Sequence, residues 1–376
     1  MTASFRLGRV AGVEVGANWS VLIVFVLLAW LLAAGRLPAR YPGRPEWAYA
    51  AAGLLAAVVF LLGLLAHEVS HAVLARRNGI QVEGITLWVF GGVARLRGEP
   101  STPGADARIA GVGPLVSLLL GLGFAGVAAL LATAGQTGLV VGTVSWLAGI
   151  NLLLAVFNLF PAAPLDGGRL LRAGLWKWRG DRAWAARAAA RTGQAFGALL
   201  IAAGFVQLAM GAAIGGLWLL LIGWFIVSAA IGERREAELG SRLSGVRVAD
   251  VMTPHPVTAP ADLTVADFVD HYLYEARHSA IPVVDEAGPA GLVTLARLRR
   301  VPPQERASTR LRAAACPMSE VPVVGPDETV MDLMPRLSKS PDARALVVRD
   351  GELVGVVSPA DVRRAVQRAA LRRAER

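Results

Sequence analysis

The sequence predicts a polytopic α-helical membrane protein with about six transmembrane helices, followed by a cytoplasmic α/β region. Two observations on composition support this fold class. Hydrophobic residues make up 55% of the 376 positions, and the mean hydropathy of +0.51 is high for a soluble globular protein. These apolar residues gather in the first 232 positions, whereas the rest of the chain has an ordinary soluble mixture. The chain therefore divides into a membrane part and a soluble part.

Uncharged stretches of about 20 residues can cross the hydrocarbon core of a bilayer as helices. Two stretches, 19–35 and 47–75, each suit one span, and Glu68 is the one charged residue in them. Two longer stretches each suit two spans, because a turn-forming segment divides them. These are 109–165, divided at "TAGQTG" (133–138), and 192–232, divided at "GAAIGG" (211–216). The total is six predicted spans.

The distribution of arginine predicts the orientation, because cytoplasmic loops of membrane proteins are enriched in Arg and Lys. With the N-terminus inside, the outside loops hold only Arg36, Arg40 and Arg44, and all other basic residues of the membrane part fall inside. We therefore expect a multi-pass protein of the cell membrane, embedded in the lipid bilayer, with both termini cytoplasmic. The second span then ends on the cytoplasmic side near residue 75.

The net charge of +10 has the same explanation. Excess Arg and Lys in a membrane protein is more often a topology signal than a binding patch, so we expect no nucleic-acid partner. The single cysteine, Cys316, excludes an intrachain disulfide.

The second predicted span contains ionisable groups in the segment "GLLAHEVSHAV" (63–73). His67 and His71 are four residues apart, so they project from one helix face and can bind one metal ion, with zinc the favoured ion. Glu68 is rotated from His67 by about 100°, so it can act on water at the metal without being a ligand, as in H-E-x-x-H hydrolases. In a soluble helix such residues are often just a polar surface. Inside an apolar span they need partners or a wet cavity, which favours a catalytic site with one Zn²⁺ per chain.

Asp166 in "NLFPAAPLDGGR" (158–169) is the candidate for a third metal ligand. It follows the long uncharged stretch and lies at the cytoplasmic end of the fourth span, at the depth expected for the two histidines. By itself Asp-Gly is a common turn pair. Pro161 and Pro164 break the helix ahead of it, and irregular backbone at membrane depth is tolerated only beside protein or water. Together with the histidine pair, these features favour the ligand role.

The combination of "HEVSH" in a second span and "NLFPAAPLDGG" in a fourth resembles the site-2 protease family of intramembrane zinc metalloproteases. Further similar segments are "AGVGPLVSLL" (110–119) and "FGGVARL" (90–96), where the family has a membrane-associated β-hairpin. The resemblance implies that His67, His71 and Asp166 bind zinc and that Glu68 is the catalytic base. It also implies a membrane-protein substrate, such as an anti-sigma factor or a membrane-tethered regulator, presented on the hairpin by β-augmentation.

Two positions qualify this resemblance. Many family members have Asn where this chain has Ser117, which leaves that contact open. Asn158 matches a family Asn near the active site and is a candidate for holding substrate or stabilising an oxyanion. Asn158 could equally be a polar residue that eases the helix break.

After residue 245 one unit is written twice. "DLTVADFV" (262–269) corresponds to "DETVMDLM" (327–334), at an offset of about 64 residues, which indicates a tandem repeat. The two copies resemble a tandem CBS domain pair. The predicted division is a membrane-embedded metalloprotease domain (1–232), a linker (233–245), a first CBS domain (246–306) and a second CBS domain (307–376).

The CBS resemblance implies that an adenine nucleotide can bind between the two halves. The second half has the ribose-contacting pattern "GVVSPAD", ending at Asp361, whereas the first half has Arg297 at that place. We expect one ribose site at Asp361 and a preference of Arg297 for phosphate. The alternative is a pair that serves only for docking of substrate or for homo-oligomer formation.

A different class of function is a zinc or other ion transporter gated by the CBS pair, because intramembrane His and acidic residues also mark ion pathways. Glu68 beside the ligands, the absence of inverted repeats and the single polar cluster argue against it. Glu68 also argues against a catalytically inactive scaffold. The sequence thus favours an enzyme.

Overall fold

The computed structural model describes residues 4–89, 91–243, 245–272, 280–286 and 288–374. The chain forms two compact units, Met1–Ala237 and Glu238–Arg376. The first contains the long apolar helices and the second contains the repeated α/β part.

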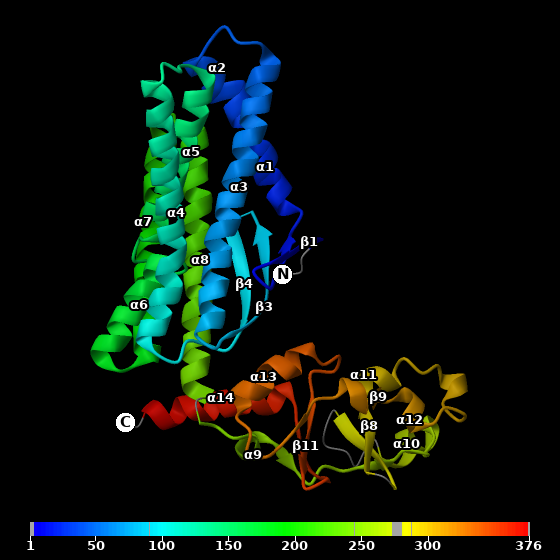
Figure 1. Ribbon diagram of the computed structural model, residues 1–376. Coiled ribbons are helices and arrows are strands. Elements are labelled where there is room, and N and C mark those ends of the chain that lie inside the picture. Colours follow the sequence, from blue (N-terminus) through cyan, green and yellow to red (C-terminus); the bar gives the residue numbers. More distant parts are fainter. Residues whose placement is uncertain (1–3, 90, 244, 273–279, 287, 375–376) are drawn as a thin grey trace. The chain divides into compact units, whose positions relative to one another are not determined.

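Among the described residues, six helices are long and apolar enough to cross a membrane, as the sequence predicts (Figure 1). The first span is divided, because a π-helical turn interrupts it. The predicted break at 133–138 coincides with the connection between α4 and α5, whereas only the start of the break at 211–216 lies in the α7–α8 connection, because α8 begins at Ala213. The spans are formed by α1 (Ser20–Trp30) with η1 (Leu31–Arg36) and α2 (Leu37–Arg40), α3 (Glu46–Arg77), α4 (Pro103–Thr133), α5 (Leu139–Asn158), α7 (Arg182–Ala209) and α8 (Ala213–Leu243).

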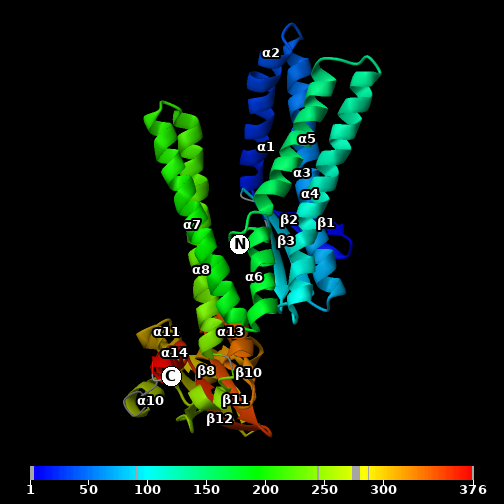
Figure 2. The same cartoon turned by 90° about the vertical axis from the view of Figure 1, so that its left-hand side faces the viewer.

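Glycines bring the membrane helices close together, as expected where the hydrophobic effect cannot drive association. A Cβ atom at Gly53 of α3 would lie 2.7 Å from the carbonyl oxygen of Ala29 in α1. In the same way, Gly197 of α7 meets the carbonyl of Gly223 in α8, with 2.8 Å to an added Cβ. The α7–α8 pair is seen side by side in Figure 2. Large apolar side chains such as Leu55, 62% exposed, point outward, where lipid would cover them.

A four-stranded sheet covers the C-terminal half of α3. Its order is β1-β2-β3-β4, with β2 and β3 parallel and the other pairs antiparallel. Buried apolar side chains of α3, β2 and β3, including Ala72, Val13 and Ile85, form a common core. β4 pairs only with β3 among the described strands, so its other edge is unpaired. The strands are β1 (Phe5–Val10), β2 (Val13–Ala17), β3 (Gln81–Trp88) and β4 (Gly91–Arg97).

The β3–β4 hairpin occupies the place where the sequence resemblance predicts a hairpin. Seven residue pairs join its strands, from Gln81 opposite Arg97 to Trp88 opposite Gly91. Phe90, at the start of "FGGVARL", lies outside the described residues. The hairpin lies beside α3 in both views (Figures 1 and 2).

A shorter helix, α6 (Asp166–Arg179), follows the fourth span. It is amphipathic and ends at Gly180, whose positive φ of 75° forms a left-handed cap. Between α5 and α6 the chain is irregular and contains a cis peptide bond at Ala163–Pro164. The predicted helix break between Pro161 and Asp166 is therefore present.

The second unit contains two four-stranded sheets, ordered β10-β11-β12-β5 and β6-β7-β8-β9. Each repeat contributes one strand to the sheet of the other, β5 from the first and β9 from the second. A shared core, with Leu292 from one repeat and Leu346 from the other, joins them. Neither repeat can complete its sheet alone, so the two form one folded unit.

The helices and strands of this unit are short. They are α9 (Val248–Val251), β5 (Thr253–Pro254), β6 (Ala259–Pro260), α10 (Val265–His271), β7 (Ala280–Asp285), β8 (Gly288–Thr294), α11 (Leu295–Leu298), η2 (Pro303–Glu305), α12 (Leu311–Ala314), β9 (Cys316–Pro317), η3 (Met318–Glu320), β10 (Val323–Val324), α13 (Val330–Lys339), β11 (Ala345–Arg349), β12 (Glu352–Val357) and α14 (Pro359–Ala374).

Most of residues 233–245, expected as a linker, are helical because α8 continues to Leu243. The segment is rich in Glu, Arg, Ala and Leu, which are strong helix formers. Leu243 is 1% exposed and belongs to a core cluster with Val248 and Val330. The last residue of α8 is thus part of the core of the second unit.

Candidate metal centre and catalytic site

The structure brings His67 and His71 of α3 together with Asp166 at the start of α6. The two Nε2 atoms are 3.2 Å apart, and each is 3.2 Å from Oδ2 of Asp166. Both histidines are nearly inaccessible, at 3% and 7% exposed. All three predicted ligands therefore meet at one point inside the membrane domain.

Hydrogen bonds on the far side of each imidazole orient the rings. Nδ1 of His71 is 2.6 Å from the carbonyl oxygen of Ile109. A carbonyl can only accept, so this nitrogen carries the proton and Nε2 presents a lone pair. Nδ1 of His67 is 2.9 Å from Oγ of Ser117, a hydroxyl that can accept its proton. Ser117 thus makes the contact that the sequence left open, and partners of this kind orient metal ligands.

The donor atoms fit a zinc ion. Bonds of 2.0–2.1 Å in a tetrahedral site place neighbouring ligand atoms about 3.3 Å apart, and the observed separations are all 3.2 Å. Two imidazole lone pairs and a carboxylate oxygen at this distance repel one another unless a cation lies between them. Nitrogen and carboxylate ligands are also the set that zinc accepts.

Small residues let the α5–α6 loop fold tightly enough to place Asp166. A Cβ atom at Gly167 would lie 2.2 Å from the carbonyl oxygen of Leu159, and one at Gly168 would lie 2.3 Å from the amide nitrogen of Ala163. The "DGG" sequence is therefore a packing requirement, and it forms the first turn of α6.

Glu68 stands beside the metal cluster and does not belong to it. Its Oε1 accepts a hydrogen bond from the backbone amide of Gly92 in β4, at 3.2 Å. A Cβ atom at Gly92 would lie 2.3 Å from Cγ of Glu68, so only glycine allows this approach. The first residues of β4 thus touch the carboxylate predicted to be the base. The second glycine of "FGG" was the available sequence signal for this contact.

Gly113 of α4 allows the equivalent approach to the histidines. A Cβ atom at this position would lie 2.2 Å from Nε2 of His71 and 2.6 Å from Nε2 of His67. The backbone of α4 therefore closes one side of the cluster. Any larger residue would enter the space of the ligand atoms.

Asn158 lies at the last turn of α5, where Nδ2 donates to the carbonyl oxygen of Leu154 at 3.1 Å. This bond fits the helix-end interpretation of Asn158. The oxyanion or substrate role remains a prediction.

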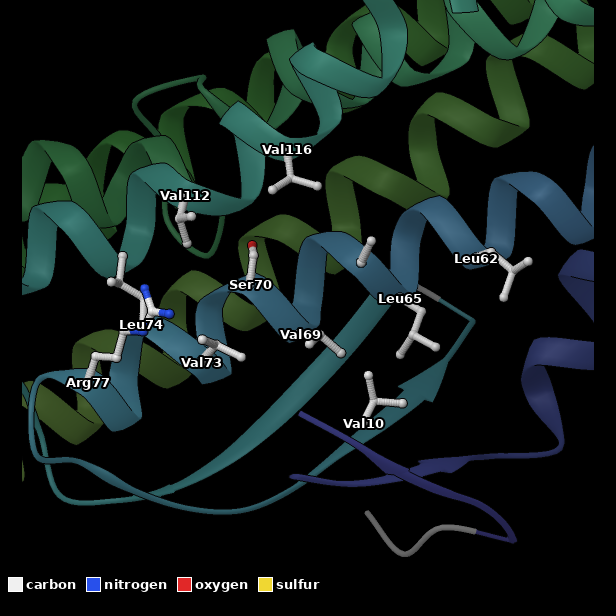
Figure 3. A pocket seen from close by; sticks show the side chains of 11 residues that line it. Val10, Leu62, Leu65, Val69, Ser70, Val73, Leu74, Arg77, Val112 and Val116 are labelled. Atoms are coloured by element: carbon white, nitrogen blue, oxygen red, sulfur yellow. The ribbon is translucent and has the colours of Figure 1, made fainter. Parts of the chain in front are cut away.

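An apolar groove of about 520 Å³ lies on another face of α3 (Figure 3). Leu62, Val69 and Val73 line it on α3, with Val112 and Val116 from α4. At 100° per residue these α3 positions are on the side opposite to His67 and His71. The groove therefore does not contain the metal cluster, and its lining suits lipid rather than water chemistry.

In the second unit, Asp361 is 4% exposed and is already bonded within its own repeat. Its Oδ2 accepts hydrogen bonds from the amide and the hydroxyl of Ser358, at 2.8 and 2.6 Å, and Oδ1 pairs with Arg364. Burial raises the pKa of Asp361, but the bonds from Ser358 and Arg364 lower it below its usual range.

Arg297 is bound to the other repeat. Its Nε donates to Oδ2 of Asp342 at 2.6 Å, and the contact raises the pKa of the guanidinium. Thr294 also donates to Asp342, at 3.3 Å. The expectation that Arg297 favours phosphate needs this pair to open, since its charge is neutralised in the structure.

A cluster of two histidines and an aspartate, with a glutamate beside it and membrane-length helices around it, is the arrangement expected of a membrane-embedded metalloprotease. The model of Peptidase family M50 matches residues 55–136 and 127–203, and the model of the CBS domain matches 248–303 and 313–368. Rip3 of Mycobacterium tuberculosis is 45% identical over 368 residues, which cover 97% of this chain and 93% of that protein. The chain therefore belongs to Peptidase family M50, the site-2 type zinc metalloproteases, and carries a CBS domain pair.

Two further comparisons also match. Zinc metalloprotease MJ0392 of Methanocaldococcus jannaschii is 28% identical over 313 residues, covering 82% of this chain and 85% of that protein. The solved structure of the site-2 protease from the same organism is 24% identical, with a TM-score of 0.42, and covers 61% of this chain and 95% of that chain.

Proposed function

We propose that the protein is an intramembrane zinc metalloprotease that hydrolyses peptide bonds in or near transmembrane segments of membrane-protein substrates. The observation that carries the proposal is the position of Glu68 between a three-ligand cluster and the unpaired edge of β4. Substrates of this type include anti-sigma factors and membrane-tethered regulators.

His67, His71 and Asp166 would hold the zinc ion, one per chain. Zinc bound there supplies Lewis acidity, which makes water more acidic and stabilises negative charge on a carbonyl oxygen. Three protein ligands leave one position open, as in catalytic zinc sites generally. Ser117 and the carbonyl of Ile109 orient the two imidazoles toward the ion.

Glu68 acts as the general base. Its carboxylate takes a proton from the attacking water and returns it to the amine of the departing peptide, which is the two-way role of a base in peptide hydrolysis. The bond from the Gly92 amide holds one carboxylate oxygen, so the other is left for the proton.

The substrate is presented on β4. A transmembrane helix hides its carbonyls in hydrogen bonds, so it must unwind before cleavage. The free edge of β4 offers backbone partners to an unwound strand, by β-augmentation. Because Gly92 of this strand touches Glu68, a strand added here would be near the base.

The orientation follows from the arginine distribution, with both termini and the CBS pair cytoplasmic. The CBS pair binds an adenine nucleotide through Asp361 and thereby changes protease activity. Binding would replace bonds that Asp361 now makes to Ser358 and Arg364. A homo-oligomer could form through the same unit.

The test is Glu68→Gln in purified protein reconstituted in vesicles with a single-span model substrate. We expect cleavage to be abolished while the zinc content stays near one per chain, because Glu68 is not a ligand. The matched control is Glu46→Gln, at the exposed first turn of the same helix, which should cleave normally. Cleavage by Glu68→Gln above the background of a metal-free sample would refute the assignment. In cells, membrane proteins that accumulate uncut with Glu68→Gln identify the substrates.

A further inference from the structure

A buried ion pair joins α4 to α6 near the metal cluster. Asp106, in the first turn of α4, is 0% exposed. Arg172 of α6 donates to both of its oxygens, from Nε at 2.9 Å and from Nη2 at 2.8 Å. Arg169, one turn earlier in α6, approaches the same carboxylate at 3.5 Å.

The pair joins two helices that both contact the metal cluster. On α4, Ile109 follows Asp106 by three residues, and its carbonyl orients His71. On α6, Arg169 and Arg172 follow Asp166 by three and six residues, and the Asp166 carboxylate meets both histidines. The ion pair therefore joins the two helices that bring the ligands together.

We propose that Asp106 and Arg172 are positioning residues that fix α6 against α4 and thereby hold Asp166 on the histidine pair. The functional consequence rests on the proposed zinc site, whereas the structural consequence, a fixed α4–α6 register, does not.

The register of α6 needs such a determinant. α6 is short and amphipathic, and an irregular loop precedes it. A slip by one residue would translate Asp166 by about 1.5 Å and rotate it by about 100°, whereas metal ligands tolerate errors of about 0.2 Å. Apolar contacts are not directional enough to prevent a slip. The planar guanidinium group of Arg172 is directional enough, because its two hydrogen bonds to Asp106 fix both position and angle.

Other charges also face the two arginines. Glu233 of α8 interacts electrostatically with both Arg169 and Arg172. Arg172 also interacts electrostatically with Glu99. Asp106 alone of these acids is fully buried and held by two hydrogen bonds to one guanidinium. The proposal therefore assigns the positioning role to the Asp106–Arg172 pair.

The first experiment reports the α4–α6 register without zinc. An added Cβ at Gly111 of α4 would lie 3.7 Å from Cδ2 of Leu170 in α6, so Gly111→Cys with Leu170→Cys places two thiols on facing helix surfaces, where a short bifunctional thiol reagent can join them. The background carries Cys316→Ser, which removes the single native cysteine. We expect Asp106→Asn and Arg172→Gln to slow cross-linking several-fold. The control is Arg9→Gln, which removes an exposed pair with Glu14 and should have no effect.

The second experiment measures zinc affinity of the full chain by competition with a chelator. We expect Asp106→Asn and Arg172→Gln to weaken binding by about tenfold or more, as for other residues that orient ligands. Arg172→Lys, which keeps the charge and loses the fork, should be intermediate. The exchanged pair Asp106→Arg with Arg172→Asp should recover part of the affinity.

The outcomes separate the two ideas. If the parent chain binds no zinc, the proposed function fails, and the cross-linking result still decides the positioning role. Unchanged cross-linking in both Asp106→Asn and Arg172→Gln would overturn that role. If either variant unfolds, Arg172→Lys replaces it, provided that its circular dichroism spectrum is that of the folded protein. Cross-linking and zinc affinity equal to those of the parent in Arg172→Lys would also overturn the positioning role.

Discussion

Replacing Gly113 by alanine adds a single methyl group at the metal cluster. The new Cβ would lie 2.2 Å from Nε2 of His71 and 2.6 Å from Nε2 of His67, whereas ordinary contacts begin near 3.4 Å. Either the imidazoles or the α4 backbone must therefore move by about 1 Å, several times the ligand tolerance of about 0.2 Å. We expect the zinc site to be lost.

The same substitution should leave the helix intact. Alanine is favoured over glycine inside a helix by about 1 kcal/mol, so α4 itself is not weakened. A misplacement of about 1 Å can reduce activity by about a hundredfold. Gly113→Ala should therefore lose at least that much activity, together with most of its zinc, in a protein that remains folded.

The assay is zinc content by atomic spectroscopy together with cleavage of a single-span substrate. Gly111→Ala is the matched control, two residues away in the same helix, because its new Cβ would meet nothing closer than 3.7 Å. It should retain zinc and activity. Refutation would be a Gly113→Ala protein with about one zinc per chain and activity close to that of Gly111→Ala.

The remaining predictions concern a metal ligand, the residues that contact His67 and Glu68, and the CBS pair. Asp166→Ala should lower zinc content, and a variant that held zinc as tightly as the parent would require another third ligand. Ser117→Ala should weaken zinc binding by about tenfold, because His67 loses its orienting partner; unchanged affinity would contradict this. Gly92→Ala should reduce cleavage and leave zinc bound, because its Cβ would displace Glu68; normal turnover would exclude close contact between β4 and the base. Asp361→Ala should weaken adenine-nucleotide binding by about one to two decades, as measured by calorimetry on the full chain. If the parent chain gave no heat with ATP, ADP or AMP at millimolar concentration, only a docking role would be left for the CBS pair.

Properties that are local in the chain could be predicted from the sequence. Six spans follow from uncharged stretches long enough to cross a bilayer, and their breaks follow from Gly-rich turns. The pairing of His67 with His71 follows from helix periodicity alone. The tandem repeat is likewise a comparison of the chain with itself. The structure has six such helices, the His67–His71 pair and two related sheets, whereas most of the predicted break at 211–216 belongs to α8.

Asp166 is an intermediate case. Its depth followed from topology, because a charge at the end of the fourth span should lie level with the end of the second. Topology cannot predict that the Asp166 carboxylate lies 3.2 Å from each of the two histidines. Those distances depend on the loop at 159–165 and on glycines that permit its close packing.

Only the tertiary structure decided the contacts between helices. Ser117 and His67 are 50 positions apart, and Asp106 and Arg172 are 66 apart. Nothing local sets the rotation and height of one membrane helix against another, because apolar faces pack in several registers. In the same way, the repeat pattern predicted an available Arg297, and folding paired it with Asp342 of the other repeat. Contacts of this kind depend on which side chains meet after packing, which is why the sequence could propose the ligands but not the residues that orient them.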